Sequence, residues 1–139
     1  MTDSAPPTNS DTHQVHALLQ EWARATREGR QDDVLQHHAA DVRLFDVLPP
    51  LQYTSAADYR ASWDEWQPDT QGEAVFAWQD LHVEAGPALA FAYGLIRCGG
   101  TLADGRSFED VVRATFGLRK VDGGWCVVHQ HVSKPWQAG

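Results

Sequence analysis

The sequence is poor in cysteine and in basic residues, and it has no long apolar run. Its 139 residues contain 2 cysteines, Cys98 and Cys126, and both lie in apolar alternating stretches. Two cysteines in such positions form no spaced framework, so we expect free thiols rather than a disulfide scaffold. No stretch of about 18 apolar residues is present, which argues against a membrane-spanning helix. The N-terminus also lacks a basic and apolar signal segment, so the chain is expected to be cytoplasmic.

Basic residues are outnumbered by acidic ones. The chain has 11 Lys and Arg against 19 Asp and Glu, and its formal net charge is -8. Partners rich in phosphate require a basic stripe, so neither nucleic acid nor an anionic membrane is expected to bind. A small molecule or another protein suits this charge better.

The length fits one domain that buries its own core without disulfides or metals. Residues 1–11 are rich in Pro, Ser, Thr and Asp without an apolar period, and they are predicted to be a disordered tail. Residues 12–135 are the predicted domain, and residues 136–139 are a C-terminal tail.

Helical periodicity marks the first part of the domain. Apolar residues recur at i, i+3 and i+4 from Thr12 onward, and Gly29 suits the position just past the end of this helix. A short second helix is predicted to start at Asp32. His37 and His38, which point about 100° apart on a helix, are expected at its surface or cap.

A strand and a third helix follow. Residues 42–47 alternate as a short strand, which the Pro49-Pro50 pair ends because proline cannot continue a ladder. Ser55 and Asp58 form a capping box, which predicts a helix that starts there. Tyr59 and Trp63 share one face of that helix.

From Gly72 onward the apolar period changes from helical to alternating. Turn residues separate the alternating runs, and Asp122-Gly123 is a strong hairpin signal. The order of elements predicts an α+β fold, with helices packed on one face of a curved antiparallel sheet. The predicted strands are Glu73–Ala85, Ala88–Cys98, Ser107–Lys120 and Trp125–Ser133.

The strand from Ala88 has one face of large side chains and one of small side chains. The large ones are predicted to fill the space under the helices, and the small ones to let another sheet or subunit approach closely. The large face carries Leu89, Phe91, Tyr93, Leu95 and Arg97, and the small face carries Ala88, Ala90, Ala92 and Gly94.

The final strand carries two histidines on a face shared with Trp125. A two-residue turn at Asp122-Gly123 would place Phe116 opposite His129 and Ala114 opposite His131. Arg113 would then point to the opposite face of the sheet. A bulge or a three-residue loop would shift this register by one and turn Arg113 inward. Three interpretations stay open: hydrogen-bonded structural histidines, a polar pocket, or a metal site, for which one His-x-His pair supplies only two ligands.

The end of the chain resembles a known family. Its motif Trp125-x-x-Val128-His129-x-His131-x-Ser133-x-Pro135, preceded by Arg113-x-Thr115 and Asp122-Gly123, is similar to the SnoaL-like branch of the nuclear transport factor 2-like superfamily. It is also similar to the association domain of calcium/calmodulin-dependent kinase II. The resemblance implies a cone-shaped, cystatin-like fold of three helices and a bent sheet, with a deep cavity between them. It also implies a homodimer formed through the outer sheet face.

The resemblance also suggests site residues. Ketosteroid isomerases of this superfamily use a carboxylate base at the position of Asp46, while their oxyanion-hole donors correspond to Trp22 and Phe116 here. Phenylalanine cannot donate a hydrogen bond, so that oxyanion hole is incomplete. SnoaL-like cyclases use an acid-base residue in the cavity, a role open to His129 and His131.

Our leading hypothesis is a protein that binds a small apolar or aromatic ligand with a carbonyl or carboxylate, and that transfers a proton without cofactor or metal. Asp46, His129 and His131 are the predicted catalytic residues, with Asp46 or Asp110 orienting one histidine. The alternative is a non-catalytic oligomeric binding or assembly module, in which arginines hold a small carboxylate. The predicted ligand contacts are Trp22, Tyr59, Trp63, Tyr93, Arg97, Asp110, Arg113 and Phe116.

Overall fold

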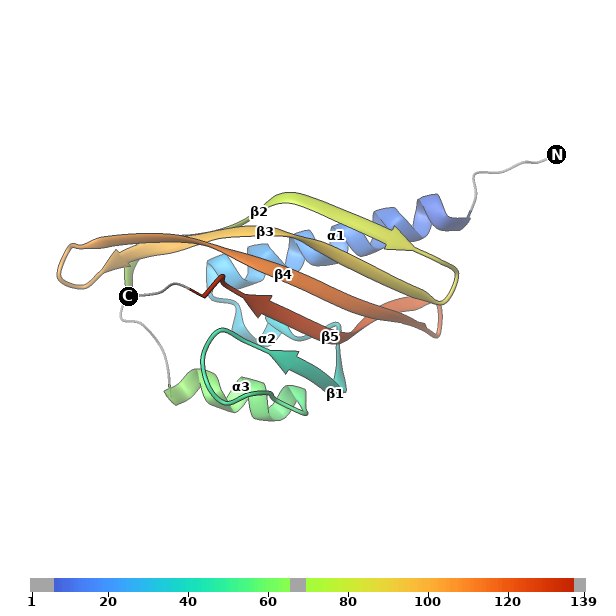
Figure 1. Cartoon of the computed structure of the whole chain (residues 1–139), viewed down its shortest axis with the longest axis horizontal. Helices are drawn as coiled ribbons and strands as arrows, with labels where there is room; N and C mark the ends of the chain where they lie inside the picture. The colour runs from blue at the N-terminus through green and yellow to red at the C-terminus, as the bar shows by residue number, and fades with distance from the viewer. Residues whose placement is uncertain (1–6, 66–69, 137–139) are drawn as a thin grey trace.

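The structure, a computed structural model, describes residues 7–65 and 70–136. It confirms the predicted α+β class: all three helices precede β2 in the chain and pack on a single sheet (Figure 1). The elements are α1 (Pro7–Glu28), α2 (Gln31–Val34), β1 (His38–Phe45), α3 (Ala56–Glu65), β2 (Thr70–Ala85), β3 (Leu89–Leu102), β4 (Ser107–Val121) and β5 (Gly124–Ser133).

The sheet is mixed rather than antiparallel throughout. Strands β2 to β5 form the predicted antiparallel meander, but β1 joins its free edge in parallel with β5, in the order β1-β5-β4-β3-β2. β1 also begins at His38 rather than at Val42, so His38 lies in a strand and not on a short helix. The N–H of Val127 donates to the carbonyl of His37 (2.8 Å), which draws this segment onto β5.

Helix α1 starts earlier than its apolar period suggested. It begins at Pro7, so residues 7–11 of the predicted tail are helical, while residues 1–6 lie outside the described residues. Asp11 is buried, and its Oδ1 accepts from Trp125 Nε1 (3.2 Å) and pairs with Lys120 Nζ (2.6 Å). The first turns of α1 are therefore fastened to the β4–β5 hairpin. Within the described parts of the chain, no helix is long and apolar enough to cross a membrane.

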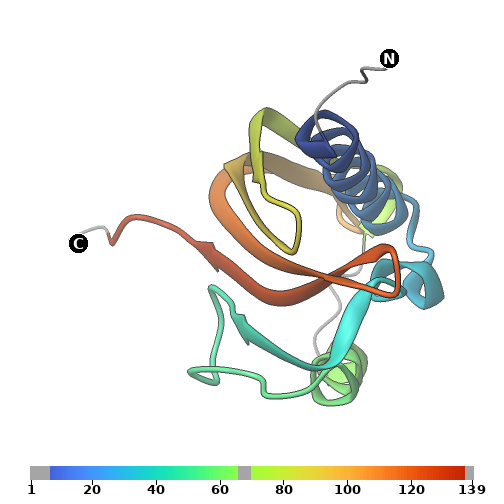
Figure 2. The same cartoon turned by 90° about the vertical axis from the view of Figure 1, so that its right-hand side faces the viewer.

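Helices α1 and α3 lie on the same side of the sheet (Figure 2). Helix α3 starts as the capping box predicts, because the N–H of Asp58 donates to Ser55 Oγ (3.0 Å). The core forms between α1 and the sheet, where the Trp22 ring meets Phe116 (centroids 4.9 Å apart) and Phe76 (5.3 Å). Burying such aromatic pairs is a major contribution to the stability of a domain of this size.

The predicted orientation of β3 is wrong. Ala90, Ala92 and Ile96 are buried under α1, whereas Leu89 is 63% exposed and Phe91 is 51% exposed on the outer face. The small residues face inward because neighbouring strands already fill this space with large rings.

Trp78 shows this crowding directly. A Cβ added at Gly94 would lie 3.1 Å from Cε3 of Trp78, tighter than ordinary van der Waals contact. The Trp78 ring in turn lies 5.8 Å from Phe116 and 6.0 Å from Trp22, centroid to centroid. Aromatic rings from α1, β2 and β4 thus fill the space that the large side chains of β3 were expected to fill.

A bulge in β5, the alternative that the sequence left open, replaces the histidine pairing of a regular hairpin. Val121 pairs with Gly124 as the Asp-Gly turn predicts, but farther from the turn the register shifts between Leu118 and Gly117. Gln130 rather than His129 therefore lies opposite Phe116, and Gln130 is buried. The bulge turns His129 and His131 to the outer face, beside Gly117 and Thr115. The partners after the shift are Gly117–His129, Phe116–Gln130, Thr115–His131, Ala114–Val132 and Arg113–Ser133.

Candidate functional site

Asp46 and Tyr59 form a hydrogen-bonded pair on the helix side of the sheet. Asp46 follows the end of β1, two residues after the buried Leu44, and Tyr59 lies in the first turns of α3. The Tyr59 hydroxyl donates to Asp46 Oδ2 (3.3 Å), and the Val47 N–H donates to Asp46 Oδ1 (2.7 Å). The carboxylate is thus fixed by one backbone donor and one phenol.

Aromatic rings surround this pair. Tyr53 is held against β1 by two backbone hydrogen bonds with Leu44 (2.9 and 3.0 Å), and its ring centroid lies 5.2 Å from that of Tyr59. Trp63 lies one helical turn after Tyr59, with ring centroids 5.3 Å apart in an edge-to-face arrangement. A polar pair framed by aromatic faces is typical of a site for an apolar or aromatic ligand.

The environment keeps the Tyr59 hydroxyl protonated. Burial raises the pKa of Tyr59, and the negative charge of Asp46 and its hydrogen bond raise the pKa further. The hydroxyl is therefore a hydrogen-bond donor across the whole neutral range. Asp46 and Tyr59 thus provide an acceptor and a donor at one place.

Asp110 is engaged elsewhere than predicted. Its carboxylate pairs with Lys134, and that hydrogen bond, followed by one from the Val111 N–H, lowers the pKa of Asp110. Asp110 therefore does not orient a histidine in this structure. Burial, with the charge of Asp110, raises the pKa of the nearby Cys98 thiol, which disfavours the reactive thiolate form.

His38 and Gln130 form a buried polar pair that sequence reasoning missed. His38 Nε2 lies 2.8 Å from Gln130 Oε1 and donates to it, while His38 Nδ1 is buried without a hydrogen-bond partner. Burial lowers the pKa of His38, with the Gln130 hydrogen bond opposing and the charge of His37 adding to the shift. The signal in the sequence for this pair was the lone Gln130 in an otherwise apolar strand. The prediction that His38 lies at the surface or caps a helix is wrong.

The structure divides the predicted site residues into two groups on opposite sides of the sheet. On the helix side lie Asp46, Trp22, Tyr59, Trp63, Asp110 and Phe116, with Trp22 and Phe116 inside the core. On the outer face lie His129, His131, Tyr93, Arg97 and Arg113. The predicted histidines are therefore not brought together with Asp46.

The outer group makes its own contacts. His129 Nδ1 lies 2.9 Å from the carbonyl oxygen of Arg43, and Arg113 Nε donates to Ser133 Oγ (3.2 Å). Arg97 pairs with Glu109 (2.7 Å). No three His, Cys, Asp or Glu side chains are grouped to hold a metal ion within residues 7–65 and 70–136.

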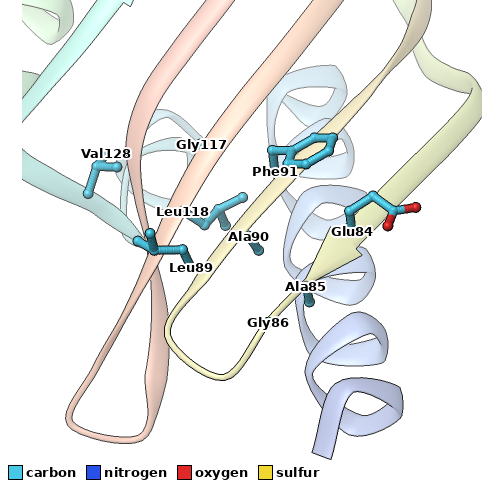
Figure 3. A pocket seen from close by; sticks show the side chains of 9 residues that line it. All are labelled: Glu84, Ala85, Gly86, Leu89, Ala90, Phe91, Gly117, Leu118 and Val128. Atoms are coloured by element: carbon cyan, nitrogen blue, oxygen red, sulfur yellow. The ribbon is translucent and has the colours of Figure 1, made fainter.

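Among the hollows lined by described residues are two that are open to the surface. The larger, about 510 Å³, lies on the outer face between the ends of β2, β3 and β4, around Phe91 and Gly117 (Figure 3). The other, about 470 Å³, lies where α1 meets α2, beside Arg60. Neither is the deep cavity that the family resemblance implies between helices and sheet.

With this geometry established, comparisons with known proteins decide the family. The model of the SnoaL-like domain matches residues 15–137. This chain belongs to the SnoaL-like domain family. The comparison with curated proteins found no match.

Solved structures agree with this membership. A nuclear transport factor 2-like protein of unknown function from Pseudomonas putida is 31% identical, with a TM-score of 0.83 over 94% of this chain and 90% of that chain. A ketosteroid isomerase-like protein from Erwinia carotovora is 16% identical (TM-score 0.76; 93% and 99% covered). The association domain of calcium/calmodulin-dependent kinase II from C. elegans is 12% identical, with a TM-score of 0.72 over 91% of this chain and 98% of that chain. The last two show the shared fold alone.

The buried His38 predicts a pH dependence of folding. Because burial lowers the pKa of folded His38 below the ordinary histidine value of 6.5, the unfolded chain binds the proton more readily below that pH. The contribution of His38 to the free energy of unfolding is therefore complete above about pH 6.5 and declines as the pH falls below it. Urea denaturation at about pH 7.5 and pH 5.5 measures this, and His38→Gln should reduce the difference between the two values. An identical difference in the variant would contradict the burial of a neutral His38.

Proposed function

We propose that this SnoaL-like protein binds a small apolar or aromatic molecule with a carbonyl or carboxylate on the helix side of its sheet, and that Asp46 transfers a proton to and from it without a cofactor. The observation that carries the proposal is the hydrogen bond between Tyr59 and Asp46 (3.3 Å) among aromatic rings. A carboxylate base and a protonated donor at one place are the minimum that proton transfer next to a carbonyl requires.

The chemistry follows from the charge of each group. The Asp46 carboxylate takes a proton from the carbon next to the ligand carbonyl, and the electron pair of that C–H bond moves to the carbonyl oxygen. Tyr59 has a single hydroxyl proton, so on ligand binding its hydrogen bond moves from Asp46 Oδ2 to the ligand oxygen, where it stabilises the developing negative charge. Return of the proton from Asp46 to another carbon gives isomerisation, and loss of a leaving hydroxide that takes up this proton gives dehydration.

The relatives support this class of reaction only by analogy. A ketosteroid isomerase-like protein shares the fold at 16% identity. Fold alone does not choose a function, so the weight of the proposal rests on Asp46 and Tyr59. His129 and His131 lie on the opposite side of the sheet and take no part in it.

Conservative substitutions at the pair test the proposal. Asp46→Asn removes the base with little change of shape, and it should lower turnover of a responsive ketone or enone by about 10²- to 10⁴-fold. Tyr59→Phe removes one donor and should lower kcat by about 10- to 100-fold, a part of what a preorganised donor contributes. Turnover of a panel of ketones and enones by the purified protein measures both.

His131→Ala is the matched control, because the earlier hypothesis made His131 catalytic and the structure puts it on the outer face. It should retain the turnover of the unmodified protein. Loss of turnover in His131→Ala with full turnover in Asp46→Asn would move the site to the outer face and overturn the proposal. Absence of turnover in the unmodified protein over the whole panel would remove the catalytic part.

A second candidate function, a non-catalytic assembly module, is favoured by one observation. The outer face of β3 exposes a row of large apolar side chains that we call the β3 strip: Leu89, Phe91, Tyr93 and Leu95. Exposed apolar rows of this kind mark interaction surfaces, and a strip facing its own copy gives a two-fold dimer. Of the small-residue face that first suggested assembly, Ala90 and Ala92 are instead buried in the core.

A charge in the β3 strip tests assembly. Phe91→Glu places a carboxylate in the centre of the strip, where two copies would bring like charges together, so dimers should dissociate to monomers in sedimentation velocity. Ala17→Glu, on the exposed face of α1, adds the same charge elsewhere and should leave the dimer intact. A monomeric unmodified protein, or a dimer that persists in Phe91→Glu, would exclude this surface.

A further inference from the structure

Trp136 differs from the other tryptophans that the structure describes. Its side chain is 87% exposed and follows the end of β5. The others lie in the core or pack against it: Trp22, Trp63, Trp78 and Trp125. An indole in water forgoes the large stabilisation that its burial provides. Figure 2 shows the end of β5 leading away from α1 and α3, so Trp136 is offered to a neighbour on the outer side of the sheet.

The larger hollow on the outer face, of about 510 Å³, has the chemistry that an indole requires. Its lining is apolar except for one carboxylate: Leu89, Phe91 and Val128 surround it, Gly117 adds no side chain, and Glu84 lies at its margin (Figure 3). Within residues 7–65 and 70–136, Glu84 has no hydrogen-bond or ion-pair partner. A buried indole N–H needs an acceptor, and Glu84 is the one that this hollow provides.

Trp136 cannot reach the hollow of its own chain. The hollow lies level with His129, because Phe91 pairs with Gly117 and Gly117 pairs with His129. From His129 to Trp136 the chain extends about 23 Å, at about 3.3 Å for each residue. The sheet holds β5 as far as Ser133, and the segment 134–136 that follows spans only about 10 Å. The indole and the hollow are therefore kept apart within one molecule.

A second copy of the chain brings the two together. Halfway between the hollow and Trp136 lies the ladder row Val132–Ala114–Gly94, which crosses the β3 strip next to Tyr93. A two-fold axis that lies between two facing sheets and runs across the strands at this level reverses the strand direction. It places Trp136 of each copy level with the hollow of the other. The symmetry of a dimer through this face thus pairs the exposed indole with the open hollow.

We propose that Trp136 of one copy inserts into the outer-face hollow of a second copy, and that the second copy does the same in return. The indole packs against Phe91 and Val128, and its N–H donates to Glu84. This inference rests on the assembly candidate given under the proposed function, and it names the contact that joins the two copies. A tryptophan that fills a partner's pocket is typical of the few residues that dominate the free energy of binding.

Mixed-label NMR of the full-length protein tests the insertion. An equal mixture of labelled and unlabelled protein reports nuclear Overhauser contacts that cross from one copy to the other. We expect such contacts between the Trp136 ring of one copy and the Phe91 and Val128 side chains of the other. A dimer without these contacts would overturn the insertion and leave the assembly candidate standing. A monomer in sedimentation velocity would overturn both.

Substitutions at Trp136 measure how much the insertion contributes. Trp136→Ala should raise the Kd of the dimer about tenfold or more in a concentration series, and Trp136→Phe, which keeps a ring but loses the N–H, should raise it less. Glu84→Ala should raise the Kd in the unmodified chain more than in Trp136→Ala, because its partner is then already absent.

Val121→Ala is the control for loss of apolar surface. Val121 is 49% exposed at the β4–β5 turn, beyond the hollow, so the Kd of this variant should not change. Equal Kd values for the unmodified protein and Trp136→Ala would overturn the proposal.

Discussion

The arrangement of both faces of the sheet depends on the β-bulge in β5. Before it, Trp125 and Val127 face the helices, and after it Gln130 does so in place of His129. Because the side chains of a strand alternate, one extra residue transfers every later side chain to the opposite face. The two sides of the molecule therefore differ in chemistry: His129 and His131 lie on the outer face, and Gln130 lies on the inner face, where its Oε1 accepts from His38.

The inner face shows why this exchange is favourable. A buried glutamine needs only neutral partners, and His38 supplies one at 2.8 Å. An imidazole in its place, next to Phe116 and under Trp22, would lose much of its hydration and would resist protonation. With the core closed in this way, the polar groups left on the helix side are those at its margins, above all Asp46 and Tyr59.

Much of the fold was predictable, because local signals are strong in this chain. The Ser55 capping box, the Asp122-Gly123 turn and the alternating runs each depend on neighbours in sequence, and the structure has each of them. The inward face of β3 was not predictable, since which face is buried depends on the space that other strands already fill, as Asp80, Leu81 and Trp78 do beside Gly94. The bulge was an open alternative that the sequence could not decide, because both faces of β5 are mostly apolar and alternation looks the same in either register.

The candidate site shows the same contrast between residues that local signals identify and contacts that depend on long-range pairing. Asp46, Tyr59 and Trp63 were predicted one by one, and the structure brings Asp46 into contact with Tyr59, which packs against Trp63. The His38–Gln130 pair requires the parallel pairing of β1 with β5, a long-range contact that no local pattern encodes. Long-range pairing is thus the step at which reasoning from residues alone stops in this chain.

The most direct measurement is the register of β4 against β5, read from cross-strand nuclear Overhauser contacts in the labelled protein. The bulged register predicts contacts of Phe116 with Gln130 and of Ala114 with Val132. Contacts of Phe116 with His129 and of Ala114 with His131 would instead show a regular hairpin with both histidines turned toward the helices, and would contradict the division of the two faces.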